Sequence, residues 1–362
     1  MDQLDFRDTT VHTTTSTDET MVEGDPAMGV SDAFAKFVLV VYGAICLVGI
    51  TGNLLVAVVL LRVPSLRSNT SDFLVHLSVV DFMVCVLVIP SYLVPPRSNS
   101  TPNTGFFGEF WCRFYTTKYI FWVFTVTSVF CLTTVSLERY VAIVRPHKYK
   151  MVFTRKNKYI MIAGCWIMAA ITKSDMLVLY KEDEVKGCHF SGWPTTGAKA
   201  AYGLYNFILR FFFPLAVMVY AQLKVISTLN KKVKELTSRA ASTGANPRDH
   251  RREMWQLRAS QTLVKTLLAC VITFAVCWAP NQIWFLLFNF GVPMVLGSAD
   301  HRVTIILAVG NSCVNPIIYT MMNKPFRQGI LQIFCKRQGS NQVGSVNTVS
   351  ETVSSPSRQL GD

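Results

Sequence analysis

Charge is scarce in this chain. Only 16% of its 362 residues are Asp, Glu, Lys or Arg, whereas a soluble domain usually carries about 25%. Acidic residues are the scarcer kind, with 22 Asp and Glu against 35 Lys and Arg. Apolar residues make up 51% of the chain, and the mean hydropathy is +0.33. This composition excludes an ordinary soluble domain and favours a membrane protein.

Motifs of the common enzyme classes are missing as well. The chain has no G-x-S-x-G elbow, no H-E-x-x-H metal motif and no phosphate-binding loop. We therefore expect that it is not an enzyme. We also expect no cleavable signal peptide, because residues 1–34 carry eight acids, one Arg and no apolar run. We expect the first apolar segment to act as a signal anchor.

Seven long apolar segments are present. They lie at 37–61, 73–93, 114–144, 159–179, 200–229, 263–290 and 303–322. Each has the length of a membrane span, about 20 residues. The runs are continuous, whereas the strands of a membrane barrel alternate over about ten residues. The sequence therefore predicts an all-α membrane protein, a seven-transmembrane helix bundle.

Seven spans create two sets of loops that differ in charge. Lys and Arg number 21 in one set, at 62–72, 145–158, 231–262 and 323–362. They number 7 in the other set, at 1–36, 94–111, 181–199 and 291–302. Because the basic set faces the cytosol, we expect a multi-pass plasma-membrane protein with an extracellular N-terminus. The scattered charge argues against nucleic acid as a partner.

Of the ten cysteines, only Cys112 and Cys188 lie beyond the outer ends of the spans, Cys112 directly after the segment 94–111. Two thiols in an oxidising compartment predict a disulfide, with two free thiols as the alternative. Asn99 begins an outer N-glycosylation sequon, so it is a candidate glycosylation site. Residues 1–36 would form an extracellular acidic tail, followed by the bundle at 37–322.

Polar residues interrupt several of the spans. They include Asn53, Asp81, Ser128, Asn311, Ser312 and Asn315. Such groups are expensive in hydrocarbon and mark functional sites by default. A carboxylate, hydroxyls and amides together could ligate Na⁺. The alternative is a hydrated polar cluster that joins helices.

A series of motifs follows the spans in order. They are GITGNLLV with Asn53, LSVVDF with Asp81, SLERYVAIVRP with Arg139, Trp166, Pro214, FAVCWAP with Trp278, and NPIIY with Asn315. Together they resemble the rhodopsin-like (class A) G-protein-coupled receptors over about residues 37–336. The stretches CLTTVSLERYVAIVRP and CWAP resemble neuropeptide receptors of the galanin and somatostatin type.

The resemblance implies two groups of functional residues. Sodium would bind at Asp81, Ser128, Asn311 and Ser312, as an allosteric ion. Activation and coupling to a heterotrimeric G protein would involve Glu138, Arg139, Tyr140, Phe274, Trp278, Pro280, Asn315, Pro316 and Tyr319. In this scheme Glu138 holds Arg139 at rest. On activation Tyr319 swings inward, and Arg139 receives the C-terminal helix of the G protein.

Three positions depart from the family pattern. Cys112 and Arg139 are 27 residues apart, two more than usual, which leaves open the register of the outer third helix. Ser260 replaces an acid at the base of the sixth helix, so a cross-helix lock on Arg139 is absent. Gln222 replaces the usual tyrosine of the fifth helix, which alters its contact with Tyr319.

The outer halves of the spans carry cations and aromatic side chains. Phe121 stands where amine receptors of the family have Asp, and Val309 stands where opsins have the Schiff-base Lys. The candidate ligand-binding residues are Lys118, Phe121, Trp122, Lys173, Arg210, Asn281, Gln282 and Phe285. A buried Arg210 needs an anion or carbonyl partner. That partner is either a ligand carboxylate, such as a peptide C-terminus, or Asp175 or a backbone carbonyl.

These residues predict a receptor for an extracellular peptide. The alternative is a receptor for a small anionic ligand such as a lipid acid. A transporter or channel is disfavoured, because the span count is odd and no inverted repeat is visible.

The C-terminal segment supports signalling. Residues 323–337 have helical apolar spacing with basic residues between, which predicts a short amphipathic eighth helix on membrane lipid. Cys335 is its candidate palmitoylation site. We expect residues 338–362 to be disordered. Their Ser350, Thr352 and Ser355 are spaced like arrestin-binding phosphosites, so receptor kinases and arrestin are expected partners.

Overall fold

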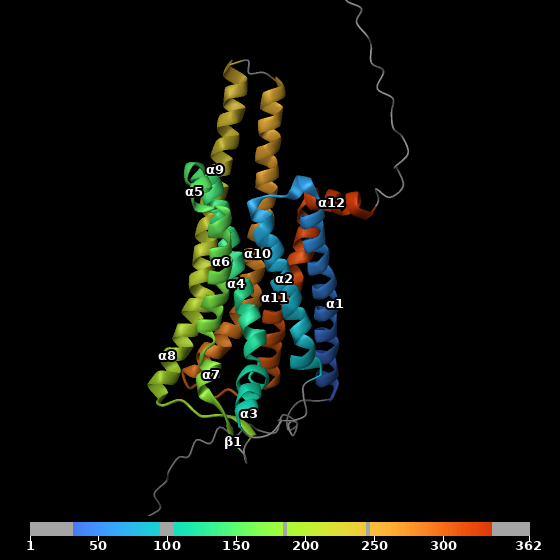
Figure 1. The fold of residues 1–362 in the computed structure, drawn as a ribbon. Helices are drawn as coiled ribbons and strands as arrows, with labels where there is room; N and C mark the ends of the chain where they lie inside the picture. The colour runs from blue at the N-terminus through green and yellow to red at the C-terminus, as the bar shows by residue number, and fades with distance from the viewer. Residues whose placement is uncertain (1–31, 95–104, 184–186, 244–246, 335–362) are drawn as a thin grey trace, which may run out of the picture.

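Seven helices of membrane-spanning length form the structure, a computed structural model that describes residues 32–94, 105–183, 187–243 and 247–334. They span Asp32–Arg62, Asn69–Leu93, Phe106–Val144, Arg155–Leu179, Thr196–Ala240, Arg248–Asn289 and Ala299–Met322. Figure 1 shows them packed side by side as one upright bundle. The predicted seven-helix membrane fold is confirmed.

The spans are built from elements of different helix type. In chain order they are α1 (Asp32–Arg62), α2 (Asn69–Val88), π turn η2 (Ile89–Leu93), α3 (Phe106–Trp111), π turn η3 (Cys112–Thr116), α4 (Tyr119–Val144), α6 (Arg155–Thr172), α7 (Asp175–Leu179), α8 (Thr196–Phe207), π turn η4 (Ile208–Phe212), α9 (Phe213–Thr243), α10 (Pro247–Asn289) and α11 (Ala299–Met322). Connections contain η1 (Pro64–Leu66), α5 (Pro146–Val152) and the antiparallel strands β1 (Tyr180–Asp183) and β2 (Gly187–Phe190). The last helix is α12 (Lys324–Phe334).

Local sequence explains where several helices begin. Ser68 caps α2 by accepting a hydrogen bond from the backbone N–H of Ser71, whose hydroxyl completes a reciprocal capping box. Thr154 caps α6 in the same way through Asn157. Pro146 stands in the first turn of α5, where its missing N–H leaves no bond unmade.

Glycine permits close contacts between helices of the bundle. A Cβ atom on Gly49 of α1 would lie 2.1 Å from the Sγ atom of Cys85 on α2. A second glycine, Gly52, faces Pro316 of α11, where a Cβ would lie 2.8 Å from the proline Cβ. α1 therefore seats against α2 and α11 through small residues, as membrane helices often do.

Several helices extend past the apolar runs that predicted them. α1 begins at Asp32, inside the segment 1–36 expected to be tail, because an acid suits the first turn of a helix. Residues 231–262 were expected to form a loop, but α9 continues to Thr243 and α10 begins at Pro247. The apolar run predicts only the part of each helix that lies in hydrocarbon. α9 and α10 continue beyond it as helices of mostly polar residues (Figure 1).

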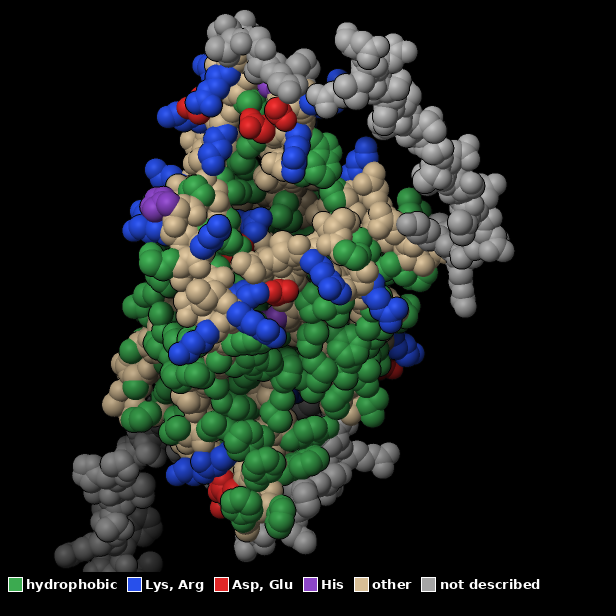
Figure 2. Space-filling view, turned by 45° about the horizontal axis from the view of Figure 1, so that its top comes forward, with side chains coloured by type: hydrophobic (Ala, Val, Ile, Leu, Met, Phe, Trp, Pro, Cys, Tyr) green, Lys and Arg blue, Asp and Glu red, His purple; other side chains and the backbone are tan. Residues whose placement is uncertain are grey.

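The surface of the bundle has the distribution expected in a bilayer. Figure 2 shows a broad band of hydrophobic side chains across the visible face, with Lys and Arg gathered toward the end that carries α5 and α12. α12 begins at Lys324 and ends at Phe334 within the predicted 323–337 segment, and Phe326 packs into the bundle. Asn99, Cys335 and the tail at 338–362 lie outside the described residues.

Candidate functional site

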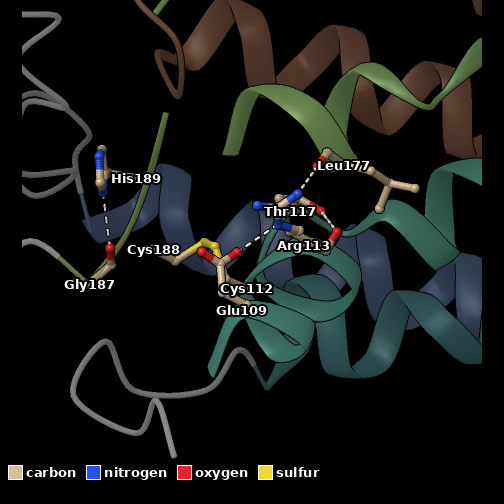
Figure 3. The surroundings of a disulfide bond; sticks show 8 residues. All are labelled: Glu109, Cys112, Arg113, Thr117, Leu177, Gly187, Cys188 and His189. Carbon is tan, nitrogen blue, oxygen red and sulfur yellow. Dashed lines mark hydrogen bonds and ion pairs between the residues drawn. A yellow bond between two sulfur atoms is a disulfide. The ribbon is translucent and has the colours of Figure 1, made fainter. Parts of the chain in front are cut away.

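One disulfide closes the end of the bundle opposite α5. Cys112, at the start of η3, bonds to Cys188 in β2, and their Cα atoms are 5.3 Å apart. Figure 3 shows Arg113 beside this bond. Its Nε atom lies 2.7 Å from Glu109 Oε2, and its Nη1 donates to the carbonyl of Leu177 at 2.6 Å. The predicted disulfide is confirmed, and it joins the third span to the strand after the fourth.

The outer third span is interrupted at Lys118. This residue has φ 60° and ψ 30°, and it is the only non-glycine residue with positive φ in the described parts of the chain. The π turn Cys112–Thr116 precedes it, and the regular helix α4 follows from Tyr119. The turn and the break lie in the stretch between Cys112 and Arg139 that is two residues longer than usual. From Tyr119 to Val144 the span is a regular α-helix.

Two lysines in the outer bundle rest on aromatic rings. The Nζ atom of Lys118 lies 4.1 Å from the ring centroid of Tyr92. The Nζ atom of Lys173, a residue only 7% exposed, lies 4.7 Å from the ring centroid of Trp122. In the described part of the chain neither ammonium forms an ion pair. Cation–π contact stabilises a desolvated cation, but it leaves the positive charge available to an anion.

Arg210 has internal partners. It lies in η4, is 3% exposed and donates from Nη2 to the backbone carbonyl of Thr172. The same nitrogen lies 3.5 Å from Asp175 Oδ1 and 3.5 Å from the hydroxyl of Tyr202. The sequence left two kinds of partner open for this arginine, a ligand carboxylate or a group of the protein itself. The structure shows groups of the protein, Asp175 and the carbonyl of Thr172. Its Nε has no hydrogen-bond partner among the described residues.

The other candidate ligand residues divide between two places. Phe121 packs edge-on against Tyr92, with ring centroids 5.4 Å apart, and joins the group around Lys118 and Trp122. Phe285 lies 6.1 Å from the ring of Tyr202, near Arg210. Asn281 and Gln282 are buried on α10, where Asn281 Nδ2 donates to Thr304 Oγ1 of α11 at 3.2 Å.

Sequence reasoning missed two aromatic residues of this region. Tyr92 lies in π turn η2. Tyr202 lies in α8, which leads directly into π turn η4. Each π turn shifts the side chains beyond it relative to an unbroken helix, so a count from the span motifs places both residues wrongly. An excess of tyrosine and tryptophan near the outer ends of the spans was the available signal.

A polar cluster occupies the middle of the bundle. Asp81 is fully buried and accepts hydrogen bonds from Ser128 Oγ at 2.6 Å and from Asn315 Nδ2 at 2.9 Å. Asn53 Nδ2 donates to the carbonyl of Ser312 at 2.9 Å. The Oδ1 atoms of Asn311 and Asn315 lack hydrogen-bond partners among the described residues. Two unused amide oxygens beside a carboxylate suit a hard monovalent cation.

Aromatic side chains connect the outer region with this cluster. The rings of Phe274 and Trp278 on α10 are buried, and their centroids lie 5.9 Å apart. Pro280 and Pro316 stand inside α10 and α11, where each removes a helical hydrogen bond. Tyr319, one turn beyond Pro316, is buried and its ring lies 6.3 Å from that of Phe326.

At the end that carries α5, Arg139 is held by Glu138. The Nε and Nη2 atoms of Arg139 donate to the two carboxylate oxygens at 2.6 and 2.8 Å. Glu138 is fully buried and also accepts from Thr70 Oγ1 at 2.8 Å and from the Tyr149 hydroxyl at 2.6 Å. The ion pairs of the described residues include none between Arg139 and α10, in keeping with Ser260 at its base.

Tyr149 remains a hydrogen-bond donor at neutral pH. Burial and the hydrogen bond to Glu138 raise its pKa to about 12. Tyr140, which follows Arg139, turns instead toward the fifth span, with its ring 6.0 Å from that of Tyr220. The arrangement is a buried carboxylate that gathers α2, α4 and α5 around one arginine.

Comparison with known proteins places these features in context. A model of the 7 transmembrane receptor (rhodopsin family) matches residues 52–319. The chain is 29% identical over 307 residues to galanin receptor type 1 of Rattus norvegicus, covering 82% of this chain and 81% of that receptor. Somatostatin receptor type 4 of Rattus norvegicus is 27% identical, with 82% and 72% covered. A crystal structure of squid rhodopsin superposes with a TM-score of 0.68 at 22% identity, with 85% and 87% covered, a likeness of fold.

Proposed function

Because this chain belongs to the rhodopsin family of seven-transmembrane receptors, we propose that it binds an extracellular neuropeptide and activates a heterotrimeric G protein. The named relatives, galanin receptor type 1 and somatostatin receptor type 4, are peptide receptors by name. A Drosophila melanogaster relative, tachykinin-like peptides receptor 99D, is 27% identical, with 82% of this chain and 56% of that receptor covered. Membership of a receptor family also bears out the expectation that the chain is not an enzyme.

The unpaired cations of the outer bundle support a ligand with an acidic group. Lys118 and Lys173 place their ammonium groups on aromatic rings, and neither forms an ion pair with a carboxylate of the described residues. Charges this deep in a membrane bundle call for an anion. A peptide C-terminus or an acidic side chain would supply it. A small anionic ligand such as a lipid acid is the second candidate, and the same two lysines favour it.

Arg210 takes a supporting role in this proposal. Its bonds to Thr172 and Asp175 tie η4 to the end of the fourth span. Breaking a buried ion pair by removing one partner leaves an uncompensated charge. Replacement of Arg210 would therefore disturb the receptor whether or not the ligand touches it, and the lysines are the more informative sites.

Coupling is assigned to the end that carries Arg139. We place this end in the cytosol of a plasma-membrane receptor, because the basic loops lie there. In that arrangement release of Arg139 from Glu138 would open the surface for the G protein. Receptor kinases would phosphorylate Ser350, Thr352 and Ser355, and arrestin would bind the phosphorylated tail. Cys335 would carry a palmitoyl group. These residues lie outside the described ranges, so their roles rest on sequence alone.

Sodium is proposed as an allosteric ligand of the central cluster. The cluster contains the carboxylate of Asp81, the hydroxyl of Ser128 that donates to it, and Ser312. It also contains Asn311, whose Oδ1 has no hydrogen-bond partner among the described residues. When bound, the ion would supply a positive charge that compensates the buried carboxylate. Asp81, Ser128, Asn311 and Ser312 would hold it, and the inactive packing of α2, α4 and α11 would be favoured.

A screen of peptides as free acids and as amides tests the ligand proposal. Calcium and cAMP responses of cells expressing the receptor would be measured, with fatty acids as a separate arm. We expect activation by a peptide with a free or side-chain carboxylate. Lys173→Gln should lower its potency by roughly tenfold or more, the loss of about 1.5–3 kcal/mol typical of a charged hydrogen bond, with Lys199→Gln as the control. Equal potency of the acid and the amide in both variants would contradict it.

A further inference from the structure

An open groove runs between α4 and α6 on the outside of the bundle. Its volume is about 210 Å³, below the roughly 300–1,000 Å³ of pockets that enclose a whole small molecule. α6 is the span with the least buried surface, and its neighbours Ile167 and Ile171 are more than half exposed. The groove therefore faces lipid, and its size suits part of a chain-like molecule.

The lining of the groove is apolar in its chemistry. Phe130, Met161, Met168 and Cys165 line it together with Thr133 and Thr134. Both hydroxyls donate within their own helix, Thr133 to the carbonyl of Val129 at 2.9 Å and Thr134 to that of Phe130 at 2.8 Å. With these donors engaged, the lining favours hydrocarbon over a polar group.

Positive charge gathers where the groove approaches the end of the bundle. Residues 145–158, which include α5 and the first turn of α6, contain six Lys and Arg and no acid. Lys158 pairs with Asp72, and the guanidinium of Arg145 lies 6.0 Å from the ring centroid of Tyr140. The other four are exposed and form no ion pair with any described residue: Lys148, Lys150, Arg155 and Lys156.

Exposed apolar side chains connect the groove with these cations. Leu137 lies one helical turn beyond Thr133 and Thr134 on α4 and is 41% exposed. Met151 of α5 is 68% exposed. α5 ends at Val152, and only Phe153 and Thr154 separate it from the start of α6 at Arg155. An apolar strip thus ends in a basic segment, the complement of a lipid tail that ends in an anionic headgroup.

We propose that this groove binds one anionic phospholipid of the adjacent membrane leaflet. One acyl chain lies between α4 and α6, and the headgroup contacts Lys148, Lys150 and the start of α6. The N-terminus of α6 adds the positive end of its helix dipole. Basic residues at a membrane surface select anionic lipids over zwitterionic ones, and the groove selects a lipid over a soluble phosphate.

Photo-crosslinking in nanodiscs tests the tail. The full-length receptor is placed in phosphatidylcholine that contains some phosphatidylserine with a diazirine in one acyl chain. A Cβ added at Gly164, in the groove, meets nothing within 4 Å, so Gly164→Phe fills the groove without a clash. We expect crosslinks to α4 and α6 peptides in the wild type and their loss in Gly164→Phe. Gly43→Phe on α1, where a Cβ also meets open space, should keep them.

Neutralising the two lysines tests the contact with the headgroup. We expect Lys148→Gln and Lys150→Gln each to lower the preference for phosphatidylserine over phosphatidylcholine by about fivefold, the factor for about 1 kcal/mol per charge. Crosslinks to α4 and α6 that survive Gly164→Phe, or that are lost equally in Gly43→Phe, would overturn the proposal. A lipid preference that survives both lysine changes would overturn its headgroup half. Gly164→Leu serves as the second filling variant if Gly164→Phe lowers expression.

Discussion

Asp81 and Arg210 show two ways in which a charged side chain is held inside this bundle. Arg210 bonds to a backbone carbonyl and a carboxylate, and so carries its neutralising partner with it. Asp81 receives neutral donors, among them Ser128 and Asn315, and it forms no ion pair with any described side chain. This difference explains why we assign an ion to one site and a structural role to the other.

Sodium should stabilise the wild-type receptor, and Asp81→Asn should remove the effect. The melting temperature of purified receptor would be compared in NaCl and in equal KCl. At ten times its dissociation constant a bound ion adds about 1.4 kcal/mol, and the amide of Asp81→Asn lacks the charge that holds it. Asp300→Asn, at the outer start of α11, is the control and should keep the sodium effect. A sodium-dependent rise that persists in Asp81→Asn would contradict this site.

At the scale of elements, the sequence predicted the spans well and their irregularities poorly. Apolar runs predicted seven helices because hydrocarbon admits few alternatives. The break at Lys118 was visible only as a spacing two residues too long, and its left-handed geometry could not be derived from that. The extension of α9 to Thr243 was missed because exposed polar helices carry no hydropathy signal. Asp81 and Asn315 were both noted in the sequence as polar residues inside spans, and a hydrogen bond of 2.9 Å joins them.

The break before α4 predicts an unusual order of stability at Lys118. An L-residue in the left-handed region pays about 1–2 kcal/mol that glycine avoids, partly offset by the greater freedom of glycine in the unfolded chain. The free energy of unfolding of Lys118→Gly should therefore exceed that of Lys118→Ala by about 0.5–1 kcal/mol, although both variants lose the ammonium. The glycine variant should then have the higher melting temperature. Lys173, with φ −109°, is the control, and there glycine should not be better than alanine. The same order at both positions would argue against the left-handed break.

At the scale of the whole molecule, the two ends of the bundle differ in the charged groups that they hold. The outer end holds Lys118 and the buried Lys173, neither of which forms an ion pair with a described residue. The other end holds the buried Glu138, which accepts hydrogen bonds from α2, α4 and α5. Between them lie Phe274, Trp278 and the Asp81 cluster. A ligand at one end can influence the other only by shifting the population of two packings of this middle layer. The state of Arg139 is the readout of that shift.

Basal coupling should rise when Glu138 loses its charge. Thr70 and Tyr149 donate to different carboxylate oxygens of Glu138, so Glu138→Gln keeps an acceptor for only one of them. The variant also loses the bidentate ion pair with Arg139, and Ser260 stands where the family often has an acid that could replace it. Ligand-free nucleotide exchange on a panel of G proteins would measure the change in reconstituted receptor. Asp72→Asn, which breaks the half-exposed pair with Lys158, should have little effect, since such surface pairs contribute about 0–1 kcal/mol. Arg139→Ala should abolish exchange in either background. Unchanged exchange in Glu138→Gln would mean that the carboxylate does not restrain Arg139 and that the resting state is held elsewhere in the bundle.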